Sequence, residues 1–62
     1  MPYVSIRVAG TLTREQKEEI CAGVTRVIAE VAGKPEDSIL IFIDEVVHEN
    51  IAHGGKLLQK PA

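Results

Sequence analysis

The sequence is poor in cysteine and in aromatic residues: it has one cysteine, no tryptophan, and a single tyrosine and phenylalanine among 62 residues. One cysteine excludes an internal disulfide, and Cys21 lies in an apolar stretch where a thiol normally acts as a small buried hydrophobic side chain. A chain this short buries only about 60% of its unfolded surface when it folds alone. We therefore expect oligomerisation to supply the missing burial.

Positive charge is also scarce, because seven lysines and arginines stand against nine acidic residues and leave a formal net charge of -2. No basic stripe or aromatic platform is present, which argues against a nucleic-acid partner. No apolar run approaches the roughly 20 residues that cross a bilayer, and no signal-peptide pattern is visible. The composition predicts a single soluble domain, residues 1–62, in the reducing cytoplasm, with neither nucleic acid nor membrane as partner.

Residues 3–8 alternate apolar and polar side chains with a period of two, which is typical of a strand with one buried face. Thr13 and Gln16 form a capping box that predicts a helix beginning near Arg14. Gly33 and the proline two residues later predict its end near Ala32. The helix carries an apolar stripe that we expect to face a sheet: Ile20, Val24, Val27, Ile28 and Val31.

Residues 39–43 form an unbroken apolar run, which indicates a second strand buried on both faces. Strand, helix and strand predict an α/β fold, a β-α-β unit with a parallel strand pair and one crossover helix. One helix covers only one face of such a sheet. We therefore expect another subunit to cover the other face.

The segment after the second strand contains His48 and His53, which are five residues apart. Zinc-protease helices need histidines four apart on one face, so no metal site is predicted. His48 is expected at the surface. A turn near Asn50 and the pair Gly54-Gly55 predict a short C-terminal hairpin, which a neighbouring subunit could extend. Asp44 and Glu45 are adjacent on a strand and point to opposite faces, so they form a poor acid/base pair.

Pro2 is the residue with the most distinctive chemistry. Cells usually remove Met1 before a small residue, and this would leave Pro2 as the amino terminus. A free proline nitrogen is a secondary amine with a reference pKa of about 8, and an apolar pocket lowers such a value toward neutrality. We expect Pro2 to act as a base once it is freed. The alternative is routine N-terminal processing without a catalytic role.

Several features occur together along the chain: Pro2, Thr13-Arg14-Glu15-Gln16-Lys17, Gly33-Lys34-Pro35, Asp44-Glu45-Val46, Asn50 and Gly54-Gly55. The combination resembles the 4-oxalocrotonate tautomerase family over essentially the whole chain. The resemblance implies that two protomers share a four-stranded sheet and that three such dimers form a homohexamer. It also implies keto-enol tautomerisation without a cofactor: Pro2 takes a proton from an enol or dienol hydroxyl of a small substrate and returns it to carbon.

The sequence departs from the family at four positions that the resemblance places in or near the substrate pocket. Leu12 and Leu40 stand where the best-studied members have substrate-binding arginines. Ile51 stands where an aromatic residue is common, and His53 stands where the related chloroacrylate dehalogenases carry a water-activating glutamate. We expect a more apolar pocket and a small enol or 2-hydroxydienoate-like substrate, with desolvation as the main cause of any lowered Pro2 pKa.

Two alternatives stay open. The first is a hydratase or dehalogenase relative, for which only His53 is available to activate water. The second is a non-catalytic or accessory subunit of a hetero-oligomer, whose partner chain would carry the missing arginines. Arg7 does not replace them within one subunit, because strand alternation places it on the face opposite Pro2. A neighbouring subunit could still supply it.

Overall fold

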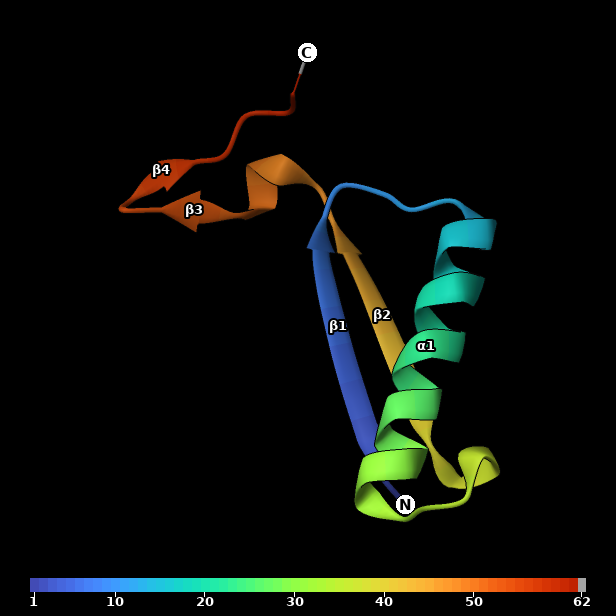
Figure 1. Ribbon diagram of the computed structural model, residues 1–62. Coiled ribbons are helices and arrows are strands. Elements are labelled where there is room, and N and C mark those ends of the chain that lie inside the picture. The colour runs from blue at the N-terminus through green and yellow to red at the C-terminus, as the bar shows by residue number, and fades with distance from the viewer. Residues whose placement is uncertain (62) are drawn as a thin grey trace.

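In the computed structural model, which describes residues 1–61, one helix covers one face of a two-stranded parallel sheet (Figure 1). The strands are β1 (Tyr3–Ala9) and β2 (Leu40–Val46), with Tyr3 paired to Leu40 and Ala9 paired to Val46. The helix α1 (Arg14–Ala32) runs back from the end of β1 to the start of β2. The predicted β-α-β unit is confirmed, although β2 begins one residue later and ends three residues later than expected.

The ends of α1 lie where the sequence predicts them because both are fixed by local hydrogen bonds. The Gln16 backbone N–H donates to Thr13 Oγ1 at 3.1 Å, and the Thr13 backbone N–H donates to Gln16 Oε1 at 2.9 Å. These two bonds form the complete capping box. At the other end, Gly33 adopts a left-handed conformation with φ of +66° and ends the helix.

The apolar stripe of α1 is narrower than predicted. Ile20, Val24 and Ile28 are half-buried, but Val27 and Val31 are 57% and 83% exposed, so their predicted contact with the sheet is wrong. Val27 lies about 100° around the helix from Ile28, and two strands are too narrow to cover both. Val31 stands in the last turn of the helix.

The C-terminal segment folds into the predicted hairpin. A 3-10 turn, His48–Asn50, leads into β3 (Ala52–His53), which pairs antiparallel with β4 (Lys56–Leu57). The turn between these strands uses Gly54 and Gly55 with φ of +61° and +83°, which suits a two-residue hairpin turn. The hairpin projects away from the sheet (Figure 1).

The protomer is open and has almost no core of its own. Only Ile39 among the described apolar residues is classed as buried, at 9% exposure. The accessible surface is 5076 Å², whereas a globular monomer of this mass would have about 3,900 Å². The radius of gyration is 14.6 Å, against about 10.6 Å for a compact domain of this length. This shape supports the expectation that other subunits complete the fold.

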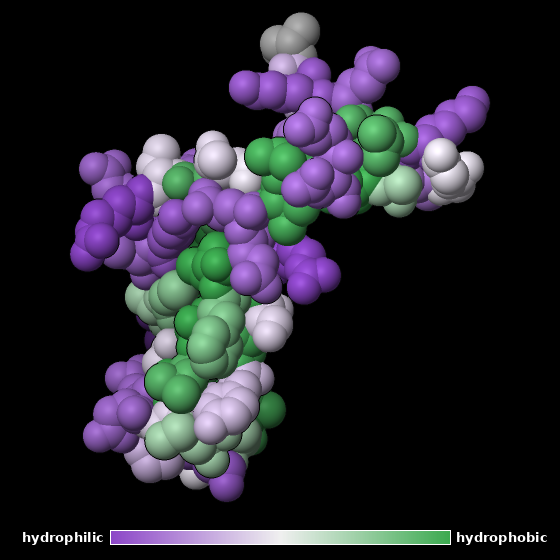
Figure 2. Space-filling view, turned by 180° about the vertical axis from the view of Figure 1, so that it is seen from behind, coloured by the Kyte–Doolittle hydropathy of each residue, from purple (hydrophilic) through white to green (hydrophobic). Residues whose placement is uncertain are grey.

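The sheet face opposite α1 is bare and apolar. Tyr3, Leu40 and Phe42 are 68%, 42% and 52% exposed, and we call these three residues the bare sheet face. Apolar side chains gather along the middle of the molecule when it is seen from behind (Figure 2). The second strand is therefore covered on one face only within a single chain. Over residues 1–61, no helix is long and apolar enough to cross a membrane.

Candidate active site

Pro2 lies at the start of the sheet, directly before β1, and is half-buried. Its carbonyl accepts a hydrogen bond from the Leu40 backbone N–H at 3.0 Å. The backbone of β2 therefore fixes the position of Pro2 from one side. Of the predicted pocket residues, Leu40 is the one that the structure places beside Pro2.

The bare sheet face begins next to Pro2. The rings of Tyr3 and Phe42 meet edge to face, with their centroids 6.2 Å apart and their planes at 86°. On the same face Arg7 and Asp44 are paired in the strand register, and Arg7 Nη2 lies 3.8 Å from Asp44 Oδ2. Arg7 thus points away from the half-buried residues Val4 and Ile6, as strand alternation predicts.

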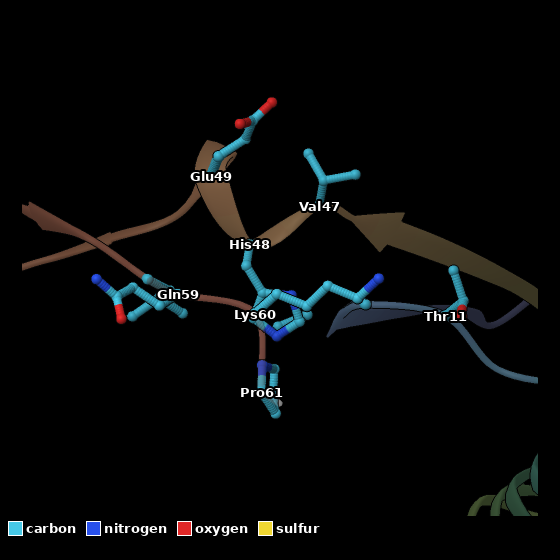
Figure 3. A pocket seen from close by; sticks show the side chains of 10 residues that line it. Thr11, Val47, His48, Glu49, Gln59, Lys60 and Pro61 are labelled. Atoms are coloured by element: carbon cyan, nitrogen blue, oxygen red, sulfur yellow. The ribbon is translucent and has the colours of Figure 1, made fainter.

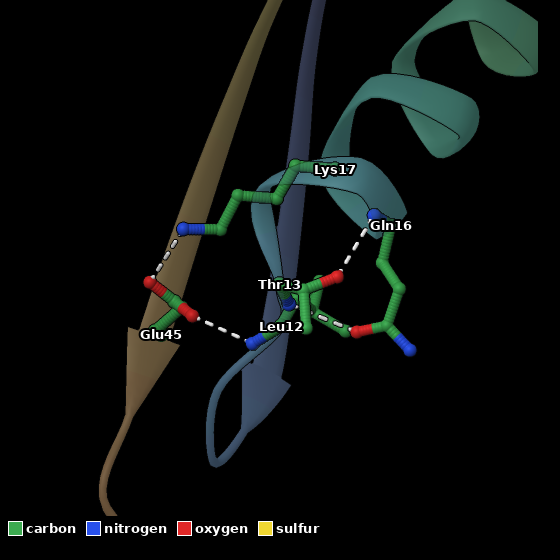
Figure 4. Close-up of polar contacts among 5 residues, drawn as sticks. All are labelled: Leu12, Thr13, Gln16, Lys17 and Glu45. Carbon is green, nitrogen blue, oxygen red and sulfur yellow. Dashed lines mark hydrogen bonds and ion pairs between the residues drawn. The ribbon is translucent and has the colours of Figure 1, made fainter.

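Leu12 lies at the opposite end of the sheet from Pro2. The seven residues of β1 separate the two, which corresponds to at least about 20 Å of extended strand. The Leu12 backbone N–H donates to Glu45 Oε2 at 2.7 Å, and Lys17 Nζ lies 2.9 Å from Glu45 Oε1 (Figure 4). The sequence does not predict these contacts, because it shows only that Glu45 points away from Asp44.

The contacts of Glu45 also set its ionisation. The hydrogen bond from the Leu12 N–H, and then the hydrogen bond and positive charge of Lys17, hold the pKa of the Glu45 carboxyl below its ordinary value. Glu45 is therefore a carboxylate at neutral pH. It serves as an acceptor there and does not serve as a proton donor.

Ile51 and His53 belong to the C-terminal hairpin segment, beyond the end of β2. Ile51 is half-buried, and its carbonyl accepts a hydrogen bond from the Leu58 backbone N–H at 2.8 Å. His53 is exposed in β3. A single chain therefore does not bring the predicted site residues together: Pro2 and Leu40 are at one end of the sheet, and the other three are at or beyond its opposite end.

A cavity of about 780 Å³ lies at this opposite end, so it is not a pocket for Pro2 within one chain. Gly10, Thr11, His48, Lys60 and Pro61 are among its lining residues (Figure 3). His48 is half-buried here, which corrects the prediction of a surface residue. The reason is its packing on Gly10, where an added Cβ would lie 3.3 Å from the His48 ring.

Within residues 1–61 no group of three or more histidine, cysteine, aspartate or glutamate side chains could hold a metal ion. While Met1 is attached, the Pro2 nitrogen is an amide, and its neighbours include Leu40 and the aromatic pair of Tyr3 and Phe42. An amine freed in apolar surroundings can transfer a proton, because such surroundings disfavour its charged form and weaken competition from water.

Comparison with known proteins identifies the family. A family model for tautomerase enzymes matches residues 2–60. A probable tautomerase of Bacillus cereus is 40% identical over 58 residues, which cover 94% of this chain and 95% of that relative.

Two solved structures have the same fold over most of the chain. A homologue of 4-oxalocrotonate tautomerase superposes with a TM-score of 0.84 at 34% identity, covering 90% of this chain and 92% of the other. A structure that concerns trans-3-chloroacrylic acid dehalogenase activity superposes with a TM-score of 0.81 at 36% identity, covering 94% and 100%. Because the family model spans nearly the whole chain and the relatives have matching lengths, the chain belongs to the tautomerase enzyme family, and its resemblance to 4-oxalocrotonate tautomerase is confirmed.

Proposed function

We propose that Pro2, freed by removal of Met1, is the group with which this keto-enol tautomerase moves its proton. The observation that carries the proposal is the position of Pro2, half-buried at the start of the sheet and bonded through its carbonyl to β2. While Met1 is attached, the Pro2 nitrogen is an amide without basicity. Once it is free, the amine removes the proton from the enol hydroxyl, and the electrons of the broken O–H bond form the C=O double bond. The π electrons of the carbon–carbon double bond then form a new C–H bond to the proton that the amine returns.

The substrate we propose is a small, largely apolar enol with at most one carboxylate. Leu12 and Leu40 supply no charge-assisted hydrogen bonds, each of which would contribute about 1.5 to 3 kcal/mol to binding an anion. Apolar side chains instead favour an aromatic or aliphatic enol and disfavour the charged form of the proline. A compound of the phenylpyruvate type fits this description.

A site that combines Pro2 with Leu12, Ile51 and His53 would require more than one copy of the chain, because these three residues lie far from Pro2 within a protomer. We propose a homo-oligomer, a hexamer built as a trimer of dimers, in which other copies bring these residues to each Pro2. The bare sheet face and about 1,200 Å² of surface beyond that of a globular monomer support it. The reducing cytoplasm suits a chain whose single thiol is Cys21.

The test begins with the intact mass of the purified protein, which establishes whether Met1 is gone. Ketonisation of phenylpyruvate enol is then followed by ultraviolet absorbance for wild type, Pro2→Ala and the matched control Pro35→Ala. General acid–base catalysis contributes about 10²- to 10⁴-fold, so Pro2→Ala should lose that factor and Pro35→Ala should not. A Pro2→Ala variant as fast as wild type, or a Met1-bearing protein of equal activity, would contradict the role of Pro2.

A second candidate activity is hydrolytic dehalogenation, which is favoured by the likeness to the structure concerned with trans-3-chloroacrylic acid dehalogenase activity. His53 is the side chain available to activate water in that reaction. Chloride release from trans-3-chloroacrylate distinguishes the two activities, and our proposal expects none above background. An accessory subunit is a further alternative, and an active homo-oligomer of this chain alone would exclude it.

A further inference from the structure

Residues 10–13, which we call the Leu12 loop, connect β1 to α1 and are anchored twice to the end of β2. The Gly10 backbone N–H donates to the Val46 carbonyl at 2.8 Å, and the Leu12 backbone N–H donates to Glu45 Oε2 at 2.7 Å. The second anchor is a charge-assisted bond, which is shorter and stronger than one between neutral groups. The loop is thus held by the backbone at its start and by one side chain at its centre.

Glu45 also reaches the first turn of α1 through Lys17 Nζ, 2.9 Å from its other oxygen (Figure 4). Across residues 1–61, every other hydrogen bond made by a side chain joins residues three apart, whereas the two bonds of Glu45 span 33 and 28 residues. The Glu45 and Lys17 side chains are 29% and 35% exposed, so solvent screens this pair less than a free surface pair. A single carboxylate therefore joins the loop, the helix and the sheet.

We propose that Glu45 is a positioning residue that fixes the Leu12 loop and so sets the place of the Leu12 side chain in the substrate pocket. This inference rests on the proposed function, in which Leu12 lines the pocket of a tautomerase. A leucine side chain has no polar atom that could bond to a substrate and fix its position, so the position of the Leu12 side chain depends on the Leu12 backbone. The paired charge of Lys17 lets Glu45 do this without adding net charge beside an apolar pocket.

Positioning of an apolar wall acts on binding more than on proton transfer. Replacing Glu45 by Gln leaves one acceptor oxygen and removes the charge, so one of the two contacts is lost and the other weakens. We expect Glu45→Gln to raise KM for phenylpyruvate enol about tenfold while kcat stays within about twofold, because Pro2 is untouched. Glu18→Gln is the matched control, since the exposed Glu18 forms an ion pair with the exposed Arg14 on the same helix, and it should leave both constants unchanged.

A double-mutant cycle separates positioning from a general loss of stability. If Glu45 acts through Leu12, the Glu45→Gln change should alter KM by less than about twofold in a Leu12→Ala background. An equal rise in KM in both backgrounds would overturn the proposal. So would a Glu45→Gln protein that has a lower Tm and unaltered KM and kcat.

Amide hydrogen exchange at Leu12 tests the tether independently of activity. Exchange should be at least about tenfold faster in Glu45→Gln than in wild type, and unchanged in Glu18→Gln. If wild type ketonises no enol, the proposed function fails, and unaltered Leu12 exchange would then overturn the tether as well. If Glu45→Gln does not fold, Glu45→Asp replaces it, because its carboxylate is one methylene too short to reach the Leu12 N–H: faster Leu12 exchange supports the tether, and wild-type exchange refutes it.

Discussion

Phe42→Glu tests whether the bare sheet face is the surface through which the chain assembles. Phe42 is 52% exposed in the protomer, so covering the rest of its side chain contributes on the order of 1 kcal/mol per copy. A buried glutamate adds a desolvation cost of several kcal/mol. Together these terms raise the dissociation constant of an assembly through this face by at least about 10³-fold.

The assay is the molar mass in solution, measured by light scattering at a protein concentration of about 10 μM. Wild type should have a multiple of the 6.7 kDa chain mass, and Phe42→Glu should shift toward that single mass and unfold at lower temperature. Ala22→Glu is the matched control, because it adds the same charge on the exposed side of α1. A Phe42→Glu protein of wild-type mass, or a folded monomeric wild type, would refute the reasoning.

Three further perturbations test local features. Thr13→Ala removes one half of the capping box and should cost about 0.5 to 2 kcal/mol of unfolding free energy in urea titrations, whereas the exposed Thr11→Ala should cost little. Gly10→Ala forces φ of +99° on a residue with a Cβ and pushes that atom against His48, so it should lower Tm and cost about 1 to 2 kcal/mol. The Glu45 pKa is held below its ordinary value of 4.5, so the stabilising contribution of Glu45 is present above pH 4.5 and is lost as the pH falls through the lowered pKa. The Tm difference between wild type and Glu45→Gln should therefore disappear in acid. A difference that persists in acid would count against the two Glu45 contacts.

The parts of the fold that the sequence predicts are those fixed by neighbouring residues. Thr13 with Gln16 defines one end of α1, and Gly33 defines the other, because caps act over three or four residues. The glycine pair in the hairpin turn is equally local. The exposure of Val27 could not be predicted in this way, because it depends on the width of the sheet and not on the helix.

The site is less accessible to sequence reasoning, because its contacts join distant residues. Nothing in the pattern around Glu45 indicates that its carboxylate meets the backbone of Leu12, 33 residues away. The resemblance places Leu12 and Leu40 in one pocket, yet within a protomer they lie at opposite ends of β1 and β2. Within one chain nothing relates these positions, so a shared pocket would need the assembly of several copies that we propose, and no local signal in a single chain encodes such an assembly.

A site shared between copies makes a quantitative prediction for mixed oligomers. In a twofold dimer, each site would take Pro2 from one chain and Leu12 from the other. The Pro2→Ala and Leu12→Glu proteins, each inactive alone, would form mixed dimers when they are refolded together in equal amounts. About half of the dimers would be mixed, and each mixed dimer would have one intact site of its two. Activity should therefore return to about one quarter of wild type, whereas a site contained in one chain would give no recovery.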